Sequence, residues 1–202
     1  GKKISFETGK IARQANGSVV VQCGETMVFA SACGSQKPAS VDFLPLRIDY
    51  QENFSAVGKT LGGFIKRQGK LSQKEILVCR LIDRPLRPMF PEGFYNEVQL
   101  LCYVWSYDGI NAPEPLAITA ASAALAISDI PLVKPVAGVR VGLVDGKFVV
   151  NPTIQEMKES RLDLLLAGTE DAVLMIEGYC DFLTEEQVLE AIEKGQKAIH
   201  NI

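Results

Sequence analysis

One stretch of the sequence, residues 64–90 (FIKRQGKLSQKEILVCRLIDRPLRPMF), restricts the local structure more than any other. The tetrapeptide SQKE has the pattern of a capping box, in which the Ser72 hydroxyl accepts from the backbone N–H of Glu75 while the Glu75 carboxylate reaches back to Ser72. A helix is therefore predicted to begin near Gln73. It is predicted to end by Arg84, because the proline that follows disfavours the helical region for its predecessor.

The same stretch concentrates positive charge. It holds seven of the 21 Lys and Arg residues of a chain whose formal net charge is −3. A basic block in an acidic chain indicates a surface held positive for an anionic partner, and Arg side chains suit phosphate oxygens, which they bind bidentately. The alternative is a solvated helix face with one ion pair between Asp83 and an Arg. The seven residues are Lys66, Arg67, Lys70, Lys74, Arg80, Arg84 and Arg87.

Length and composition bound the remaining possibilities. With 202 residues, 47% of them hydrophobic, the chain can bury a full core as one large domain or as two small halves. No apolar run approaches the roughly 20 residues of a membrane span. His200 is the only histidine, which argues against a His-based triad or metal site. The chain opens with Gly-Lys-Lys and not with Met, which we interpret as a mature form or an excised piece.

The cysteines are five in number, without CxxC spacing, and most lie in apolar runs. This pattern predicts reduced, buried thiols in a cytosol-like compartment, and argues against disulfides and zinc. The five are Cys23, Cys33, Cys79, Cys102 and Cys180.

Strands are predicted where apolar runs, alternating or continuous, are bounded by turn residues. Asp145 and Gly146 fit a type I′ hairpin turn, in which both central residues need positive φ. The predicted strands and hairpins are 18–23 with 26–33, 44–50, 98–106, the hairpin 137–150, 162–168 and 172–178.

Two more helices are predicted. Residues 115–128 form a helix so rich in Ala that it must pack closely against another element. A second capping box at Thr184 begins a helix that runs to the C-terminus. The whole order predicts the α+β class, with mixed sheets covered by helices. The apolar stripe of the last helix, predicted to lie in the core, is Val188, Leu189, Ile192 and Ile199.

The basic stretch and its flanks resemble the RNase PH family, and within it the first of the two core domains of the polynucleotide phosphorylases. The resemblance runs in order along essentially the whole chain. It implies an RNase PH-like core (ribosomal protein S5 domain 2-like) over residues 1–202, with a helical linker, a second core and C-terminal RNA-binding modules outside it. The matching runs are FIKR from Phe64, IDRPLRPMFPEGF from Ile82, SDIP from Ser128, VVNPT from Val149 and LDLLLAGT from Leu162.

The resemblance also implies an activity. It is that of a phosphate-dependent 3′→5′ exoribonuclease, or polyribonucleotide nucleotidyltransferase, which degrades RNA to nucleoside diphosphates and can polymerise them in reverse. The whole enzyme would use Mg²⁺ and inorganic phosphate, neither of them expected to bind this domain tightly. Its partners would be single-stranded RNA, the second core of the same chain and two further copies in a homotrimeric ring, with no membrane. The sequence looks most like the plant chloroplast form, so the chloroplast stroma is expected; the bacterial cytoplasm and the mitochondrion are alternatives.

RNA contacts are implied residue by residue. The family's RNA-gripping loop has two Phe followed by two Arg, whereas this chain has FIKR. One stacking ring is lost, so a weaker grip through Phe64 and Arg67 is expected. An internal ion pair of Arg84 with Asp83 is the alternative to a ligand contact. The candidate RNA-binding residues are Phe64, Lys66, Arg67, Arg80 and Arg87, with Arg84 as the candidate phosphate contact.

The catalytic pattern of the family is incomplete here. The catalytic core binds phosphate with a Ser-rich turn before the Ala helix, where this chain has NAPEP from Asn111, with two prolines, one acid and no hydroxyl. That core also places two carboxylates and a Lys around a divalent metal. Asp163 matches one carboxylate, Met157 stands in place of the other, and Leu165 in place of the Lys. One carboxylate is a poor Mg²⁺ site, so no metal site is predicted and Asp163 is a possible catalytic remnant.

The domain is therefore predicted to be a non-catalytic core that forms the ring and guides RNA, with the chemistry in the second core. The alternative is a catalytically inactive RNA-binding scaffold of an exosome-like ring, for which the missing Ser turn is the argument.

Overall fold

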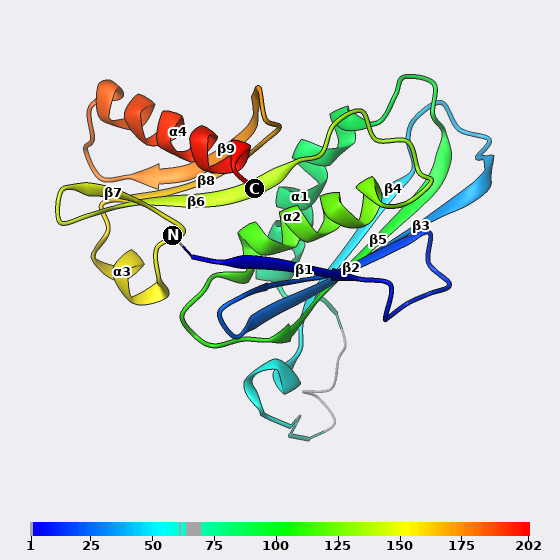
Figure 1. Ribbon diagram of the computed structural model, residues 1–202, viewed down its shortest axis with the longest axis horizontal. Coiled ribbons are helices and arrows are strands. Elements are labelled where there is room, and N and C mark those ends of the chain that lie inside the picture. The colour runs from blue at the N-terminus through cyan, green and yellow to red at the C-terminus, as the bar shows by residue number, and fades with distance from the viewer. Residues whose placement is uncertain (1, 61, 64–69) are drawn as a thin grey trace.

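The structure, a computed structural model, describes residues 2–60, 62–63 and 70–202. Over these residues the chain folds into two β-sheets layered with helices (Figure 1), which confirms the predicted α+β class. The strands are β1 Ile4–Thr8, β2 Gly17–Cys23, β3 Thr26–Pro38, β4 Leu46–Glu52, β5 Asn96–Ser106, β6 Ala137–Val144, β7 Lys147–Val150, β8 Leu162–Gly168 and β9 Val173–Cys180. The helices are α1 Gln73–Leu86, α2 Pro113–Ala126, α3 Ile154–Glu159 and α4 Glu185–His200, with short 3₁₀ turns η1 Phe54–Val57 and η3 Arg87–Met89.

The larger sheet has the strand order β1-β2-β3-β5-β4. β2 and β3 form the predicted hairpin, with Cys23 opposite Thr26. β5 pairs antiparallel with β3 and parallel with β4, and α1 lies in the crossover that a parallel pair requires. α1 and α2 pack on this sheet over a core in which Val28, Tyr50 and Leu100 are fully buried.

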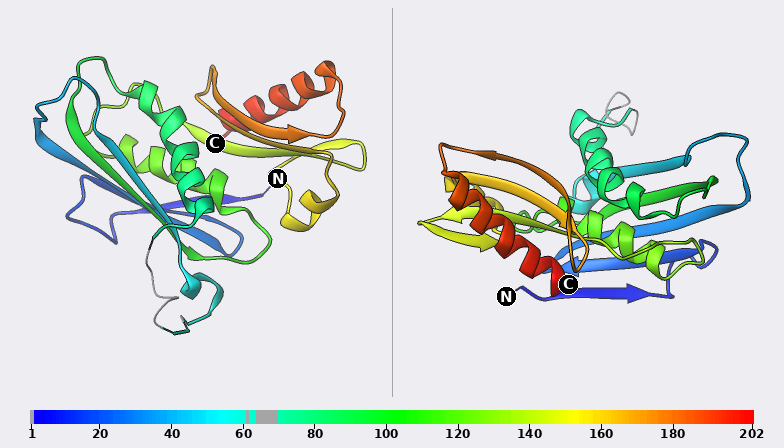
Figure 2. Two further views of the ribbon diagram at one scale, coloured as in Figure 1. Left: turned by 180° about the vertical axis from the view of Figure 1, so that it is seen from behind. Right: turned by 90° about the horizontal axis from the view of Figure 1, so that it is seen from above.

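The smaller sheet, in the order β7-β6-β8-β9, is antiparallel and covered on both faces. Because side chains alternate along a strand, Val139 and Leu166 pack in the cluster under α4, while Leu165 and Met175 join the core around α2. α4 lies along the outer face of this sheet, and α2 lies between the two sheets (Figures 1 and 2).

α2 is almost entirely buried and lies very close to its neighbours. Ala117, Ala120, Ala121 and Ala124 expose no surface. A Cβ atom added to Gly17 of β2 would overlap the carbonyl oxygen of Ala124. The small side chains of the helix thus bring its backbone against the sheet, as its Ala-rich sequence predicts.

Two helix boundaries differ from the predicted ones. α1 begins at Gln73 but runs through Pro85 to Leu86, so the predicted end at Arg84 is wrong. Pro85 and Leu86 are buried in the core, and this burial outweighs the conformational bias that a proline imposes on its predecessor. α2 begins at Pro113, two residues before the predicted start, because a helix's first turn tolerates a residue without an N–H.

Other local predictions are confirmed. The capping boxes at Ser72 and Thr184 both form, and Asp145 and Gly146 have the positive φ angles, 49° and 73°, that the hairpin turn needs. Leu189 is exposed, so that part of the predicted core stripe of α4 is wrong; the buried residues of the helix are Ala191, Gly195 and Ile199. Within the described residues no helix is long and apolar enough to cross a membrane.

All five cysteines are free thiols, as predicted. Cys23 and Cys102 are buried and Cys79 is half-buried, but Cys33 and Cys180 are exposed. The prediction of burial is therefore wrong for the last two, which lie where β3 and β9 leave the packed faces of their sheets.

Candidate functional site

A cleft of about 290 Å³ opens between α1, β9 and the first turn of α2. Apolar side chains of α1 and β8 form part of its wall, together with Tyr179 of β9. The cleft brings Asp163 and Leu165, both singled out in the sequence, next to the start of the Ala-rich helix. Its charged residues come from five elements: Lys74, Glu114, Arg140, Asp163 and Glu177.

Lys74, which lines the cleft, bridges two acids. Its Nζ lies 2.7 Å from Glu52 Oε1 and 3.2 Å from Glu114 Oε1. Burial alone would lower the pKa of Lys74, but the hydrogen bond to Glu52 and the negative charge of Glu114 outweigh it and raise that pKa. The second Glu114 oxygen, Oε2, is buried without a hydrogen-bond partner among the described residues. The first turn of α2 therefore places a carboxylate in the cleft, and Lys74 balances its negative charge.

Arg140 and Asp163, which also line the cleft, form a bidentate pair. Arg140 Nε donates to Asp163 Oδ1 at 2.7 Å and Nη2 donates to Oδ2 at 2.5 Å. The hydrogen bonds from Arg140 to Asp163 raise the pKa of the guanidinium. The Asn151 side chain accepts from the Arg140 backbone N–H and fixes this strand position. Sequence reasoning missed Arg140, because its partner depends on the register between β6 and β8.

The side chains in the cleft do not fit the Mg²⁺ that the resemblance implies for the whole enzyme. Both oxygens of Asp163 already accept from a guanidinium. Met157 places its sulfur over Gly142, and Leu165 is buried. Over the described chain, no group of three or more His, Cys, Asp or Glu side chains could hold a metal ion.

The turn before α2 is held by Asp108, which the sequence did not single out. Its carboxylate accepts from the backbone N–H groups of Glu25, Ile110 and Asn111 and from the side chains of Thr26 and Asn111. Burial alone would raise the pKa of Asp108, but these hydrogen bonds lower it far below its ordinary value. N–H groups of this turn are thus used internally, and are not free to bind phosphate.

The three predicted arginines have different surroundings. Arg80 is exposed and has no hydrogen bond or ion pair within the described part of the chain. Arg84 pairs with Glu177 of β9 at 3.0 Å, not with Asp83. Arg87 pairs with Asp83 at 2.6 Å and also donates to two backbone carbonyls at the start of β4. Arg80 is therefore the arginine whose donors are free for a ligand.

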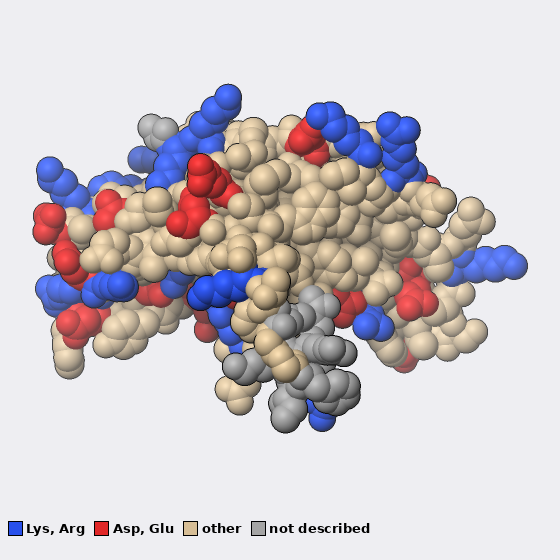
Figure 3. Space-filling model, turned by 90° about the horizontal axis from the view of Figure 1, so that it is seen from below, with Lys and Arg blue, Asp and Glu red and all other residues tan. Residues whose placement is uncertain are grey.

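The other predicted RNA contacts, Phe64, Lys66 and Arg67, lie outside the described residues. On the face shown in Figure 3, the described basic and acidic side chains are interspersed. The described residues of that face therefore do not form, by themselves, a continuous basic patch that could bind phosphates.

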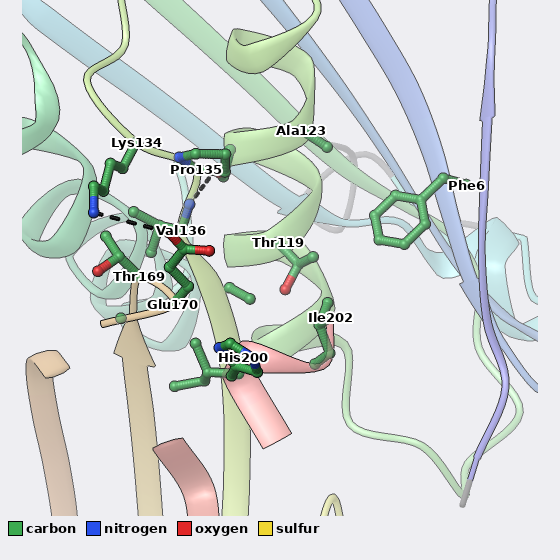
Figure 4. Close-up of a pocket in the computed structure, with 14 residues that line it drawn as sticks. Phe6, Thr119, Ala123, Lys134, Pro135, Val136, Thr169, Glu170, His200 and Ile202 are labelled. Atoms are coloured by element: carbon green, nitrogen blue, oxygen red, sulfur yellow. Dashed lines mark hydrogen bonds and ion pairs between the residues drawn. The ribbon is translucent and has the colours of Figure 1, made fainter. Parts of the chain in front are cut away.

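A second cavity of about 330 Å³ lies between β1, α2 and the C-terminal end of the chain (Figure 4). Thr119 donates to the Pro115 carbonyl and accepts from the Gly138 N–H. Lys134 on its rim pairs with Asp171. The Thr119 hydroxyl and the Lys134 ammonium of this cavity therefore already have partners within the chain.

Comparison with protein-family models divides the chain into two matched parts. Residues 1–131 match the 3′ exoribonuclease family, domain 1, and residues 134–198 match the same family's domain 2. The boundary falls between α2 and β6, so the first part holds the larger sheet with α1 and α2, and the second holds the smaller sheet with α3 and α4.

Curated relatives match the whole chain. The polyribonucleotide nucleotidyltransferase of Protochlamydia amoebophila is 70% identical over 202 residues, and that of Chlamydia pneumoniae is 67% identical over the same length. The chain spans 29% of the length of each of these relatives. Both relatives are chlamydial, which gives no support to the expected plant chloroplast source and favours the bacterial alternative.

Solved structures share the fold at low sequence identity. Rice Rrp46 superposes with a TM-score of 0.78 at 18% identity, over 99% of this chain and 90% of that one. A chain of the Archaeoglobus fulgidus exosome with RNA bound to the active site superposes with a TM-score of 0.75 at 16% identity, over 99% of this chain and 86% of that one. From the matched models and the shared fold we conclude that the chain belongs to the 3′ exoribonuclease (RNase PH) family.

Proposed function

We propose that this chain is the first, non-catalytic core of a phosphate-dependent 3′→5′ exoribonuclease, a polyribonucleotide nucleotidyltransferase. The observation that carries the proposal is the 61–70% identity over the whole chain to longer proteins of that name. The whole enzyme degrades RNA to nucleoside diphosphates with inorganic phosphate and Mg²⁺, and runs in reverse as a polymerase. The chemistry belongs to a second core outside these 202 residues.

The charges of the cleft support the non-catalytic part of the proposal. Phosphorolysis brings inorganic phosphate beside a phosphodiester, and the repulsion between two anions has to be offset by free donors or a cation. Here Glu114 lines the cleft in the first turn of α2, while Arg140 and Lys74 are already paired with carboxylates. An inactive scaffold of an exosome-like ring shares this feature, but the likeness to exosome proteins is one of fold alone.

RNA guidance is assigned to Arg80 and to the basic segment that contains Phe64, Lys66 and Arg67. Arg87 and Arg84 hold internal ion pairs, so their proposed role is to shape the end of α1 beside the RNA path. The proposed partners are single-stranded RNA, the second core of the same chain and two further copies in a homotrimeric ring. The proposed location is the bacterial cytoplasm, by analogy with the chlamydial relatives.

Phosphorolysis tests the catalytic assignment. The 202-residue chain, incubated with RNA, Mg²⁺ and phosphate, is expected to release nucleoside diphosphate no faster than background, because loss of even one preorganised donor costs about 10²–10³ in rate. The comparison is an equal molar amount of the full-length enzyme. A rate within tenfold of that enzyme, abolished by Asp163→Asn, would place a working active site in this core.

RNA binding tests the guidance role. The affinity for single-stranded oligoadenylate, measured by fluorescence anisotropy, is expected to fall steeply with salt because bound phosphates release counterions. Arg80→Ala should weaken binding and reduce the log–log salt slope by about 1. The matched control is Lys158→Ala on α3, outside the basic stretch. An affinity that does not change with salt contradicts the proposal.

A further inference from the structure

The cleft that Asp163 lines is built from one sheet face and one helix face. The register of β8 and β9 places Asp163 opposite Tyr179. Leu165, two residues further along β8, lies opposite Glu177, so all four side chains belong to the same face of the smaller sheet. The lining residues of α1 follow the spacing i, i+3, i+4 and i+7, which is that of a single helix face. They are Lys74, Leu77, Val78 and Leu81.

The walls of this cleft suit a small, flat ligand. Tyr179 lines the cleft and yet is 70% exposed, so its ring is accessible for stacking. The aliphatic side chains of α1 and the buried Leu165 supply further apolar contacts. At about 290 Å³ the cleft lies near the lower limit of ligand pockets, which is about 300 Å³. Its size therefore restricts the ligand to about one ring system.

The charges of the cleft select against an ion as the ligand. Every charged side chain that lines it has a partner of opposite charge. A free anion would meet three carboxylates there, and a free cation would meet an ammonium and a guanidinium group. The ligand that fits is therefore neutral and recognised by hydrogen bonds. The pairs are Lys74–Glu114, Arg140–Asp163 and Arg84–Glu177.

Two of the paired side chains keep hydrogen-bonding groups that the pairs do not use. Arg140 donates to Asp163 through Nε and Nη2, and its Nη1 has no acceptor within the described part of the chain. Glu177 accepts from Arg84 through Oε2, and no described residue donates to its Oε1. Leu165 is the cross-strand partner of both Arg140 and Glu177. A ligand that lies over Leu165 therefore meets donors on one side and an acceptor on the other.

We propose that this cleft binds a nucleobase, with guanine as the best match. Guanine is neutral and flat, it accepts through O6 and N7, and it donates through N1–H and N2–H₂. Arginine side chains bind the O6 and N7 atoms bidentately, so this edge is assigned to Arg140. The N1–H and N2–H₂ edge is assigned to Glu177, and the ring stacks on Tyr179. The inference goes beyond the proposed function, which gives the cleft no ligand and binds RNA through cations elsewhere.

The test uses the 202-residue chain and guanosine, a probe that carries no phosphate and therefore gives the basic stretch no anion to bind. In an NMR titration, the backbone amides of Leu165, Glu177 and Tyr179 are expected to shift as guanosine is added. Adenosine should bind about fivefold or more weakly, because it places an amino donor where guanine has the O6 acceptor that faces Arg140.

Variants of Tyr179 test the stacking contact. Tyr179→Ala changes an exposed position, so the fold is expected to persist and guanosine should bind about fivefold or more weakly. Tyr179→Phe should bind as the unmodified chain does, because stacking needs the ring and not the hydroxyl. Tyr95→Ala is the matched control, since Tyr95 is an exposed tyrosine outside the cleft, and it should leave the affinity unchanged.

The outcomes separate this inference from the proposed function. If millimolar guanosine shifts none of these amides, or if Tyr179→Ala binds guanosine as tightly as the unmodified chain, the proposal is overturned. Equal affinities for guanosine and adenosine overturn the assignment of guanine. The proposed function stands in each case, because phosphorolysis and salt-dependent binding of oligoadenylate test it separately.

A last arm identifies the source of the base. If a short RNA that contains guanosine shifts the same amides, the base comes from RNA. If only free guanosine shifts them, the ligand is a nucleoside. Both results support a nucleobase site in this cleft.

Discussion

Asp108 shows how much one side chain organises in this fold. Five donors from two segments converge on its carboxylate, and they join the turn between β2 and β3 to the turn before α2. Hydrogen bonds to an ionised acceptor are roughly twice as strong as neutral ones, so this carboxylate is a strong local tie.

Replacing Asp108 by Asn should destabilise the chain by about 2 kcal/mol at neutral pH, because an amide offers one acceptor where the carboxylate offers two. The pKa of Asp108 is lower in the folded state than its ordinary value of 3.8, so the folded state gains from ionisation. That gain is fully present above the ordinary value and is lost as pH falls through the folded-state pKa. Urea unfolding at pH 7 and pH 3 checks this, and a stability difference that does not narrow in acid contradicts it.

Thiol reactivity should follow exposure. Burial raises the pKa of Cys102 to about 12, so its thiol is both inaccessible and protonated at neutral pH. Cys33 and Cys180 are exposed and should react with a thiol-specific reagent within the first phase of labelling. Mass spectrometry of the native chain is expected to find these two modified and Cys102 unmodified until a denaturant is added. Early labelling of Cys102 would contradict the described packing.

Sequence reasoning at this scale succeeded where partners are close along the chain. Ser72 and Glu75 are three residues apart, so their pairing could be predicted from the capping-box pattern alone. The partner of Arg84 could not, because Glu177 is 93 residues away and reaches it only through the packing of α1 on β9. The sequence therefore could not show that the Arg84 guanidinium, predicted to contact phosphate, already pairs with a carboxylate of β9.

At the scale of elements, the close approach of α2 to β2 determines which residues fit. Gly17 has no side chain, and the Ala124 carbonyl occupies the place where a Cβ would be. The obstacle is backbone, which cannot rotate away as a flexible side chain can.

Gly17→Ala should therefore destabilise the chain by about 1–3 kcal/mol through overpacking. Gly62→Ala is the control, since a Cβ there would meet no atom within 4 Å, and it should leave stability unchanged or slightly raised. Thermal unfolding followed by circular dichroism measures both. Equal melting temperatures for the two variants would mean that the helix and strand can separate at little cost.

The sequence predicted which segments form helices and strands, but it did not predict every helix end or which side chains of a helix face the core. Hydrophobic periodicity located α4, yet Leu189 fits the same stripe as its buried neighbours and is exposed. A stripe gives the mean direction of the core, whereas the width of the contact depends on how the sheet curves under the helix. Pro85 is a similar case. The local preference of the residue before a proline predicted that α1 ends at Arg84, but the helix continues to Leu86 because Pro85 and Leu86 are buried in the core.

At the scale of the whole molecule, the α+β class and helix-covered sheets could be predicted, but the strand order could not. β5 lies between β3 and β4, which precede it in sequence. Placing it there requires knowing that α1 crosses over the sheet, since the strand runs alone do not fix their neighbours. The cleft could not be predicted for the same reason, because its charged residues come from five elements that meet only in the complete fold.

The position of α2 between the sheets has a consequence for how the chain can be divided. The first matched family segment contains α2, and the second contains a sheet whose inner face α2 covers. Neither segment expressed alone can shield its apolar surface, so each should remain unfolded or aggregate. Mixed together, the two fragments should reconstitute a native-like complex. The two matched segments are therefore expected to unfold together as a single cooperative unit, because both need α2 to cover their apolar faces.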